Sequence, residues 1–296
     1  MAANTTLLCI GAGAEQLAAI ELGQRMGHRV VALDGNPQSP GLSVADQGIV
    51  VDLRDEQEVI QIARETDASC VIPVPLGAVL TTVGAINDAM GWRGISHKAA
   101  LACTDKTVMR ETLAEAGGAQ PNFRNVHSLT DARDAAHAIG LPVVLKPAHG
   151  SGSRGVALIR SDSELNLLLA RAQAEGRFTA TGGMLVESEM SGQEHGVDGV
   201  VVDGICTVLS VRTKLISPPP NRVALEYAGP ISLPPAVSSA VQTTIQSAVN
   251  ALGLDDCMMH ADVMIDLQQS QVSVIELSGR PSGFGLCLVM LSACIG

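Results

Sequence analysis

Residues 143–156 read VVLKPAHGSGSRGV. This stretch joins a short apolar run, which is typical of a buried strand, to a loop that begins just after Lys146. Glycines at Gly150, Gly152 and Gly155 let backbone N–H groups turn toward an anion, and Lys146 adds a positive charge. No GK[ST] triplet follows, so the loop is not of the Walker type. The pattern of strand, loop and strand predicts a hairpin whose tip closes over a phosphate, although a plain connection explains the same letters.

The composition limits the number of domains and excludes nucleic acid as a partner. The chain has 296 residues, which suits two or three packed subdomains. Hydrophobic residues make up 46% of it, enough for sizeable cores, whereas aromatic residues make up only 2%. A base-stacking surface needs aromatic side chains, and a formal net charge of −11 repels a phosphate backbone. We therefore expect no nucleic-acid partner.

Cysteine usage and hydropathy favour a cytoplasmic protein that does not enter a membrane. The seven cysteines are odd in number and form no CxxC pair, which is typical of reduced thiols in the cytoplasm. The first residues lack the basic region of a signal peptide. No window reaches the roughly 18 apolar residues of a membrane span. Residues 283–296 are apolar but short, so they predict a buried helix, and a chain that stops inside such a segment looks truncated.

The first hundred residues alternate strand and helix patterns, which predicts a parallel sheet with crossover helices. Their first turn carries half of a dinucleotide-binding fingerprint: Gly11 and Gly13 are present, and Asp34 ends the second strand pattern. Position 16 is Gln16, where the fingerprint has its third glycine. We favour a Rossmann-like fold that needs a tight first turn over an NAD-dependent dehydrogenase.

The last two strand patterns predict a hairpin that brings two carboxylates together. A turn centred at Gln268–Gln269 places Asp262 opposite Glu276. Strict alternation puts the following side chains of the second strand on one face: Val272, Val274, Glu276, Ser278 and Arg280. Facing like charges destabilise a sheet unless a cation lies between them, and Mg²⁺ prefers oxygen ligands. The hairpin therefore predicts a metal site, with a solvated face and an Arg–Glu pair as the alternative.

Four motifs, in this order, resemble those of the ATP-grasp superfamily, and the likeness covers most of the chain. They are residues 104–121, 143–156, 185–199 and the paired strands 260–266 and 274–283. Among members, the chain is most similar to stand-alone carboxylate–amine ligases of the L-amino-acid ligase kind.

The resemblance implies an α/β fold with α+β character in its C-terminal part. A Rossmann-like domain would span residues 1–95, and a small lid subdomain with the glycine-rich loop would span residues 96–185. A mixed-sheet large lobe, truncated at its end, would span residues 186–296. ATP would lie between lid and lobe. Within the lid region, Thr104 or Asp105 is expected to cap a helix that begins beside Lys106.

The resemblance assigns the phosphates of ATP to the lid. Lys106 and Lys146 would neutralise the α- and β-phosphates, and Gly152 and Ser153 would cover the terminal phosphates with backbone donors.

Two acids flank a turn in the third motif. Glu187 ends an apolar strand, and Glu194 opens the next one. By spacing alone, such acids could bind ribose hydroxyls or simply be solvated. The resemblance places Glu187 at the adenine edge and Glu194 on the ribose.

The resemblance implies that the fourth motif binds the metal and the carboxylate substrate. Asp262, Glu276 and Ser278 would hold Mg²⁺, with Mn²⁺ as an alternative metal, and Arg280 would bind the carboxylate substrate or its acyl phosphate. Two residues depart from the family pattern: Ser278 stands where asparagine is usual, and Asp262 where glutamate is commoner. His260 would contact substrate or fill a polar pocket, whereas Lys214 is expected to be an exposed lysine.

The implied activity is an ATP-dependent ligase that forms C–N bonds. It would activate a carboxylate as an acyl phosphate for attack by an amine, with Lys146 and Arg280 in the catalytic machinery. Its partners would be small-molecule carboxylate and amine substrates, and a homodimer is an open expectation. A bicarbonate-using carboxylase of the same superfamily, or a nucleotide-binding regulatory module with reduced catalysis, are the alternatives.

Overall fold

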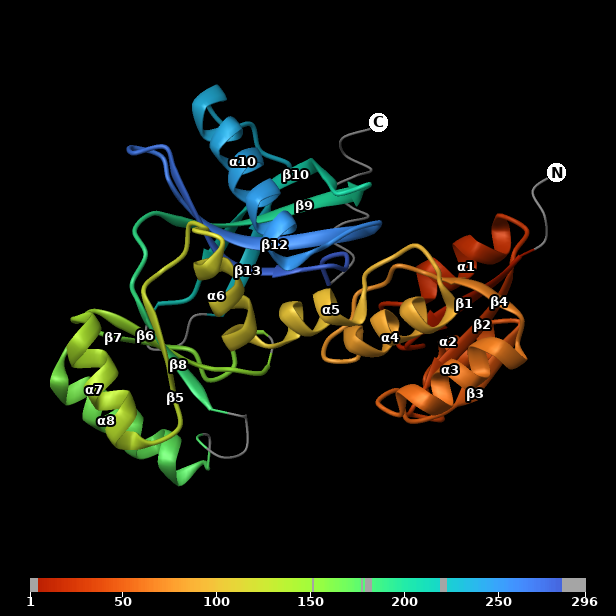
Figure 1. The fold of residues 1–296 in the computed structure, drawn as a ribbon, viewed down its shortest axis with the longest axis horizontal. Coiled ribbons are helices and arrows are strands. Elements are labelled where there is room, and N and C mark those ends of the chain that lie inside the picture. The colour runs from red at the N-terminus through yellow and green to blue at the C-terminus, as the bar shows by residue number, and fades with distance from the viewer. Residues whose placement is uncertain (1–4, 151, 177, 179–182, 219–222, 284–296) are drawn as a thin grey trace.

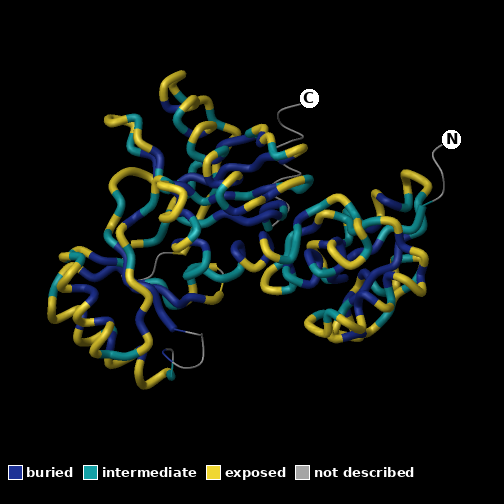
Figure 2. Tube along the Cα trace, in the orientation of Figure 1, coloured by how far each residue is buried: buried dark blue, intermediate teal, exposed yellow. Residues whose placement is uncertain are grey.

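The described residues of the computed structural model form three sheets, each with its own helices (Figure 1). The structure describes residues 5–150, 152–176, 178, 183–218 and 223–283. The predicted helix at 283–296, and with it the question of a truncated end, lies outside the described residues except for Gly283. Buried residues concentrate inside the sheets and on the inner faces of the helices (Figure 2). Among the described residues, no helix is both long and apolar enough to cross a membrane.

The N-terminal sheet is parallel, as the alternating pattern predicts. Its strand order is β3-β2-β1-β4. The strands are β1 (Thr6–Ile10), β2 (Arg29–Asp34), β3 (Gln47–Val50) and β4 (Ala68–Val71). The helices of this region are α1 (Leu17–Arg25), α2 (Gly41–Val44), α3 (Glu56–Glu65) and α4 (Leu80–Met90). Gly11 adopts φ +91° in the first turn, which confirms that this turn needs a glycine.

The lid sheet is antiparallel and has a hydrophobic core of its own. Its order is β5-β8-β6-β7. The strands are β5 (Phe123–Val126), β6 (Val143–Pro147), β7 (Ala157–Ile159) and β8 (Met184–Ser188), and the helices are α7 (Leu129–Ile139) and α8 (Asp162–Ala174). Side chains of both helices and of β6 to β8 fill one core cluster. The glycine-rich stretch joins β6 to β7, so the predicted hairpin tip is confirmed.

The C-terminal lobe is a five-stranded sheet in the order β11-β10-β9-β12-β13. Its strands are β9 (Gln193–Val202), β10 (Ile205–Ile216), β11 (Ala224–Ala228), β12 (Cys257–Asp266) and β13 (Gln271–Ser278), and its long helix is α10 (Pro235–Leu252). Every pairing in this sheet is antiparallel across the described strands, where a mixed sheet was expected. The α/β class of the whole chain is confirmed.

Two helices connect the three sheets. Helix α5 (His97–Thr104) packs between α4 and the C-terminal lobe, and α6 (Lys106–Glu115) packs against α10. Asp105 caps α6, because its Oδ1 accepts from the N–H groups of Thr107 and Val108. One core cluster runs from the N-terminal sheet through α5 and α6 into the C-terminal lobe.

The terminal hairpin confirms one prediction and corrects another. Asp262 pairs with Glu276, as predicted. However, the register shifts next to this pair and skips Ile275, so β13 contains a bulge. Val274 therefore faces the core, whereas Glu276 lies on the opposite face with Asp262. The predicted common face of Val272, Val274 and Glu276 is wrong, because strict alternation does not allow for the extra residue.

The separate lid core makes a testable prediction about α8. Leu169 is fully buried in that core, whereas Leu167 on the same helix is 70% exposed. Leu169→Ala should lower the free energy of unfolding by about 2–5 kcal/mol through lost burial and the cavity it leaves. Leu167→Ala should change it by less than about 0.5 kcal/mol. Urea unfolding of both variants measures the difference, and equal costs would show that the orientation of α8 is wrong.

Candidate active site

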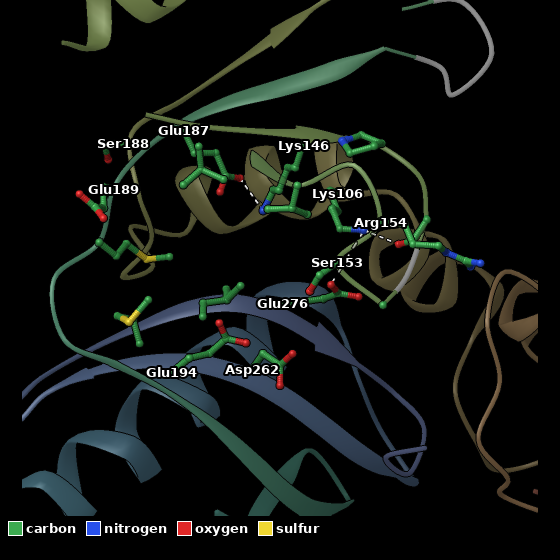
Figure 3. Close-up of a pocket in the computed structure, with 18 of the residues that line it drawn as sticks. Lys106, Lys146, Ser153, Arg154, Glu187, Ser188, Glu189, Glu194, Asp262 and Glu276 are labelled. Atoms are coloured by element: carbon green, nitrogen blue, oxygen red, sulfur yellow. Dashed lines mark hydrogen bonds and ion pairs between the residues drawn. The ribbon is translucent and has the colours of Figure 1, made fainter. Parts of the chain in front are cut away.

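One cleft between the lid sheet and the C-terminal lobe gathers most of the predicted site residues (Figure 3). The cleft is open to solvent, and charged side chains from both of its sides line it. The predicted residues that line it are Lys106, Lys146, Gly152, Ser153, Glu187, Glu194, Asp262 and Glu276. Residues 104–121, 143–156 and the later motifs are thus brought together in space.

Lys146 lies on the cleft face of β6, and it is almost fully buried. Its neighbours Val143 and Leu145 point into the lid core, so alternation turns Lys146 to the other side. Its Nζ lies 2.8 Å from Oε1 of Glu187, a diagonal neighbour on β8. Burial, together with the positive charge of the nearby Arg110, lowers the pKa of Lys146 to about 8, and the negative charge of Glu187 limits this decrease.

Glu187 is held by two cations. Besides Lys146, the guanidinium of Arg110 on α6 contacts it, with Nε donating to Oε1 at 2.7 Å. These cations outweigh burial and lower the pKa of Glu187. Glu187 lines the cleft as expected, but its carboxylate already binds Lys146 and Arg110. Its assignment to the adenine edge stays a prediction, and the nearby Ser188 and Glu189 also line that part of the cleft.

Lys106 ties the glycine-rich loop to the first turn of α6. Its backbone N–H donates to Ala148 O at 3.1 Å, and its Nζ donates to Gly150 O at 2.6 Å. The same Nζ lies 3.9 Å from Oε2 of Glu276 across the cleft. Gly152 has φ +69° and open space around it, so glycine is needed there for its conformation. Lys106 therefore lies where lid, helix and lobe meet.

The floor of the cleft is a row of acids that are joined by two largely shielded bases. Lys214, expected to be exposed, is buried, and its Nζ lies 2.5 Å from Glu194 Oε1 and 2.7 Å from Asp262 Oδ2. His260 lies between Asp262 and Asp198 at 3.2 Å from each. The positive charges of His260 and Lys214 hold the pKa of Asp262 well below its usual range despite its burial. His260 therefore fills a polar pocket, one of the two roles expected of it.

Below this row, Arg212 forms a buried ion pair with Asp198, and His195 is buried with its Nδ1 bonded to Gln193 O. Gly196 makes room for the guanidinium, because an added Cβ would come within 2.8 Å of it. The aromatic ring of Tyr227 lies 5.7 Å from the Arg212 guanidinium and 6.0 Å from Lys214 Nζ. These contacts fix the bases that in turn fix Asp262.

The pair Asp262 and Glu276 fits a Mg²⁺ ion. Both line the cleft, and they lie directly opposite each other on β12 and β13. Their oxygens are the donors that Mg²⁺ prefers. No group of three or more His, Cys, Asp or Glu side chains suited to a metal occurs among the described residues, so the protein would supply two carboxylates and a phosphate would complete the shell.

Ser278 and Arg280 are not brought to this cleft. Ser278 is buried opposite His260 and lines no part of the cleft. Arg280 lines a second, largely apolar cavity between the N-terminal sheet and the C-terminal lobe, and its Nη1 donates to Pro281 O. Their predicted roles with metal and substrate stay predictions.

Asp34, the acid of the half fingerprint, stabilises the first turn of the N-terminal sheet through hydrogen bonds. Asp34 accepts the backbone N–H groups of Ala12 and Asn36 at 2.8 Å each. Gln16 donates to Pro75 O. Asp34 thus ties this turn together, which matches the expectation of a Rossmann-like fold that needs a tight turn.

Sequence reasoning missed Arg110 and misjudged Lys214. Arg110 lies four residues after Lys106, on the same face of a helix, and this spacing was a usable signal. Lys214 follows Arg212 and Thr213 in a strand, where a polar neighbourhood favours exposure, and the acids that pair with it are distant in sequence.

Comparison with known proteins supports this assignment of motifs. A family model described as an ATP-grasp domain matches residues 139–289. The formate-dependent phosphoribosylglycinamide formyltransferase of Haloquadratum walsbyi is 28% identical over 185 residues, covering 62% of this chain and 46% of that protein. The protein of the same description from a Synechococcus species is 27% identical over 290 residues, covering 95% of this chain and 70% of that protein.

A solved structure shows the same fold. The L-amino acid ligase from Bacillus licheniformis has a TM-score of 0.79 and 21% identity, and the match covers 98% of this chain and 70% of that one. Among the sequence relatives, the match with the Haloquadratum protein covers only about half of that protein's length.

Burial and charge around Lys146 make a second prediction. In the ligand-free protein, Lys146 should lose its proton near pH 8, which is well below the pKa of an exposed lysine. Anions held by Lys146 should therefore bind less tightly above that pH. Glu187→Gln removes the charge that raises the pKa, so the midpoint should move below 8. A ¹³C NMR titration of lysine Cε signals measures it, with Lys146→Arg identifying the signal. An ordinary lysine midpoint would contradict the buried ion pair.

Proposed function

The chain belongs to the ATP-grasp domain family, and on that premise we propose that it is an Mg²⁺-dependent ligase. It would use ATP to activate a carboxylate as an acyl phosphate and pass the acyl group to an amine, forming a C–N bond. The fold-level match to an L-amino acid ligase and the sequence match to formate-dependent phosphoribosylglycinamide formyltransferases support this class.

Opposite charges on the two walls of the cleft carry the proposal. Lys106, Lys146 and Arg154 lie on the lid side, whereas Glu194, Asp262 and Glu276 lie on the lobe side (Figure 3). A polyphosphate placed between them would meet ammonium groups on one side. On the other side it would meet carboxylates that need a divalent cation. ATP with Mg²⁺ satisfies both walls at once.

The lid side also carries an excess of buried positive charge. Arg110 and Lys146 both surround the single carboxylate of Glu187. An unbalanced buried charge is costly, so a bound anion that neutralises it would be stabilised. Lys146 lines the cleft, which makes a phosphate the natural counterion.

The side chains present would support phosphoryl transfer from ATP to a carboxylate. Attack of a carboxylate on the γ-phosphate brings two anions together, and Lys106 and Lys146 would reduce that repulsion. When bound, Mg²⁺ would stabilise the charge on the transferring phosphoryl group. The glycine-rich loop, anchored by Lys106, would exclude water from the acyl phosphate until the amine attacks. Glu194 remains the proposed ribose contact.

The finer expectations are carried as parts of the same proposal. Mg²⁺ is the proposed metal, and small-molecule acids and amines are the proposed substrates. The described cysteines are all free, which supports a cytoplasmic location.

The proposal predicts Mg²⁺-dependent release of ADP from ATP that requires one acid and one amine. The assay uses pools of amino acids and small carboxylates, with bicarbonate as a separate arm. The double variant Asp262→Asn/Glu276→Gln should lower turnover by at least about 100-fold, because two oxygen ligands lose their charge. The control Glu115→Gln changes an exposed acid of α6 and should leave turnover unchanged.

Each outcome separates the candidates. Release that depends on bicarbonate alone would identify a carboxylase. ATP binding without ADP release from any pool would indicate a nucleotide-binding regulatory module. Turnover that persists in the double variant would contradict the proposed metal site.

A further inference from the structure

We propose that Arg110 is a positioning residue that sets both walls of the cleft. Through Glu187 it positions Lys146 on the lid side, and through the backbone of β13 it holds the bulge beside Glu276 on the lobe side. The inference rests on the proposed function for its catalytic meaning, but its geometry stands on contacts of the ligand-free chain.

The first arm of Arg110 reaches the lid. Its Nε donates to Glu187 Oε1 at 2.7 Å, and Nη2 lies 3.4 Å from Oε2 of the same carboxylate. Two contacts from one planar group fix the plane of the carboxylate. Lys146 Nζ binds the same Oε1 at 2.8 Å, so the orientation of Glu187 decides where the ammonium group lies.

The second arm reaches the lobe. Nη1 donates to Val274 O at 3.1 Å, and Nη2 donates to Ile275 O at 2.8 Å. Ile275 is the residue that has no opposite partner on β12. A bulge disrupts the ladder, and buried carbonyls need donors. Arg110 supplies donors to both carbonyls of the bulge, directly before Glu276.

Only arginine can make this set of contacts. Arg110 is 1% exposed, so each of its N–H groups must find a partner inside the protein. A guanidinium has five donors in a fixed fork, whereas a lysine has one compact ammonium group. Lysine could pair with Glu187, but it could not also bind two carbonyls of another sheet.

The two arms have separate consequences. Arg110→Met keeps much of the volume and removes both arms, whereas Glu187→Gln weakens only the lid arm. In Arg110→Met, the Mg²⁺ concentration for half-maximal activity should rise roughly tenfold, as for partners that orient metal ligands. Nucleotide affinity should fall in the same variant. Glu187→Gln should also lower the affinity for the nucleotide, but the Mg²⁺ concentration for half-maximal activity should stay within about twofold of the wild-type value.

A deletion isolates the lobe arm. Removing Ile275 restores regular alternation between Val274 and Glu276, so Glu276 still faces the cleft without a bulge. In that background, Arg110→Met should no longer raise the Mg²⁺ requirement. A rise of the same size with and without Ile275 would overturn the lobe arm.

A ligand-free measurement keeps this test separate from the proposed function. Removing the charge of Arg110 should raise the pKa of Lys146 above about 8, because Arg110 is one of the causes that lower it. The lysine ¹³C titration reads this without ATP or metal. Arg110→Lys retains the charge, so it should restore the wild-type midpoint but not the wild-type Mg²⁺ requirement.

The outcomes are distinct. If wild-type protein binds no ATP, the proposed function fails, while the Lys146 titration still decides the lid arm. An unchanged midpoint in Arg110→Met overturns that arm. If Arg110→Met does not fold by circular dichroism, the neutral polar variant Arg110→Gln takes its place in the Lys146 titration. Arg110→Lys then carries the lobe test, and a wild-type Mg²⁺ requirement in it overturns the proposal.

Discussion

The buried contact between Arg110, Glu187 and Lys146 constrains the rest of the structure. Charges removed from water must be paired, so the lid sheet and helix α6 can only meet where these three groups coincide. Glu187 comes from β8, Lys146 from β6 and Arg110 from α6. The backbone of β13 completes the set. A shift of the lid by one residue would leave at least one buried charge without a partner.

The lobe side of the cleft also holds charged side chains that are shielded from water, but here carboxylates outnumber the cations. Lys214 contacts both Glu194 and Asp262, and His260 also contacts Asp262, whereas Glu276 adds a further carboxylate to this wall. The lid side has two cations for one acid. The cleft is thus polarised across its width, and the polarity comes from side chains held inside the protein. Such preorganised charges need little rearrangement when a ligand arrives.

Local patterns predicted the elements well, and long-range burial decided the rest. The run VVLKP predicted a strand ending at a lysine, and the pairing of Asp262 with Glu276 followed from the turn length. The bulge at Ile275 was missed because periodicity cannot show where an extra residue is absorbed. The spacing of Arg110 from Lys106 indicates a shared helix face, but neither Arg110 nor Lys214 shows its burial in the local sequence, because a charged side chain is buried only where partners from distant strands surround it. Such residues are found by pairing, not by pattern.

The separate hydrophobic core of the lid also divides the molecule into cooperative units. The lid packs around its own cluster, whereas the N-terminal sheet and the C-terminal lobe share another through α5 and α6. Contiguous units of this kind open separately, at a free energy set by their own contacts. Opening of the lid would then break the lid's own core and the buried contact of Glu187 with Arg110, while the shared core stays intact. Protection against hydrogen exchange should then be lower throughout the lid than in the shared core.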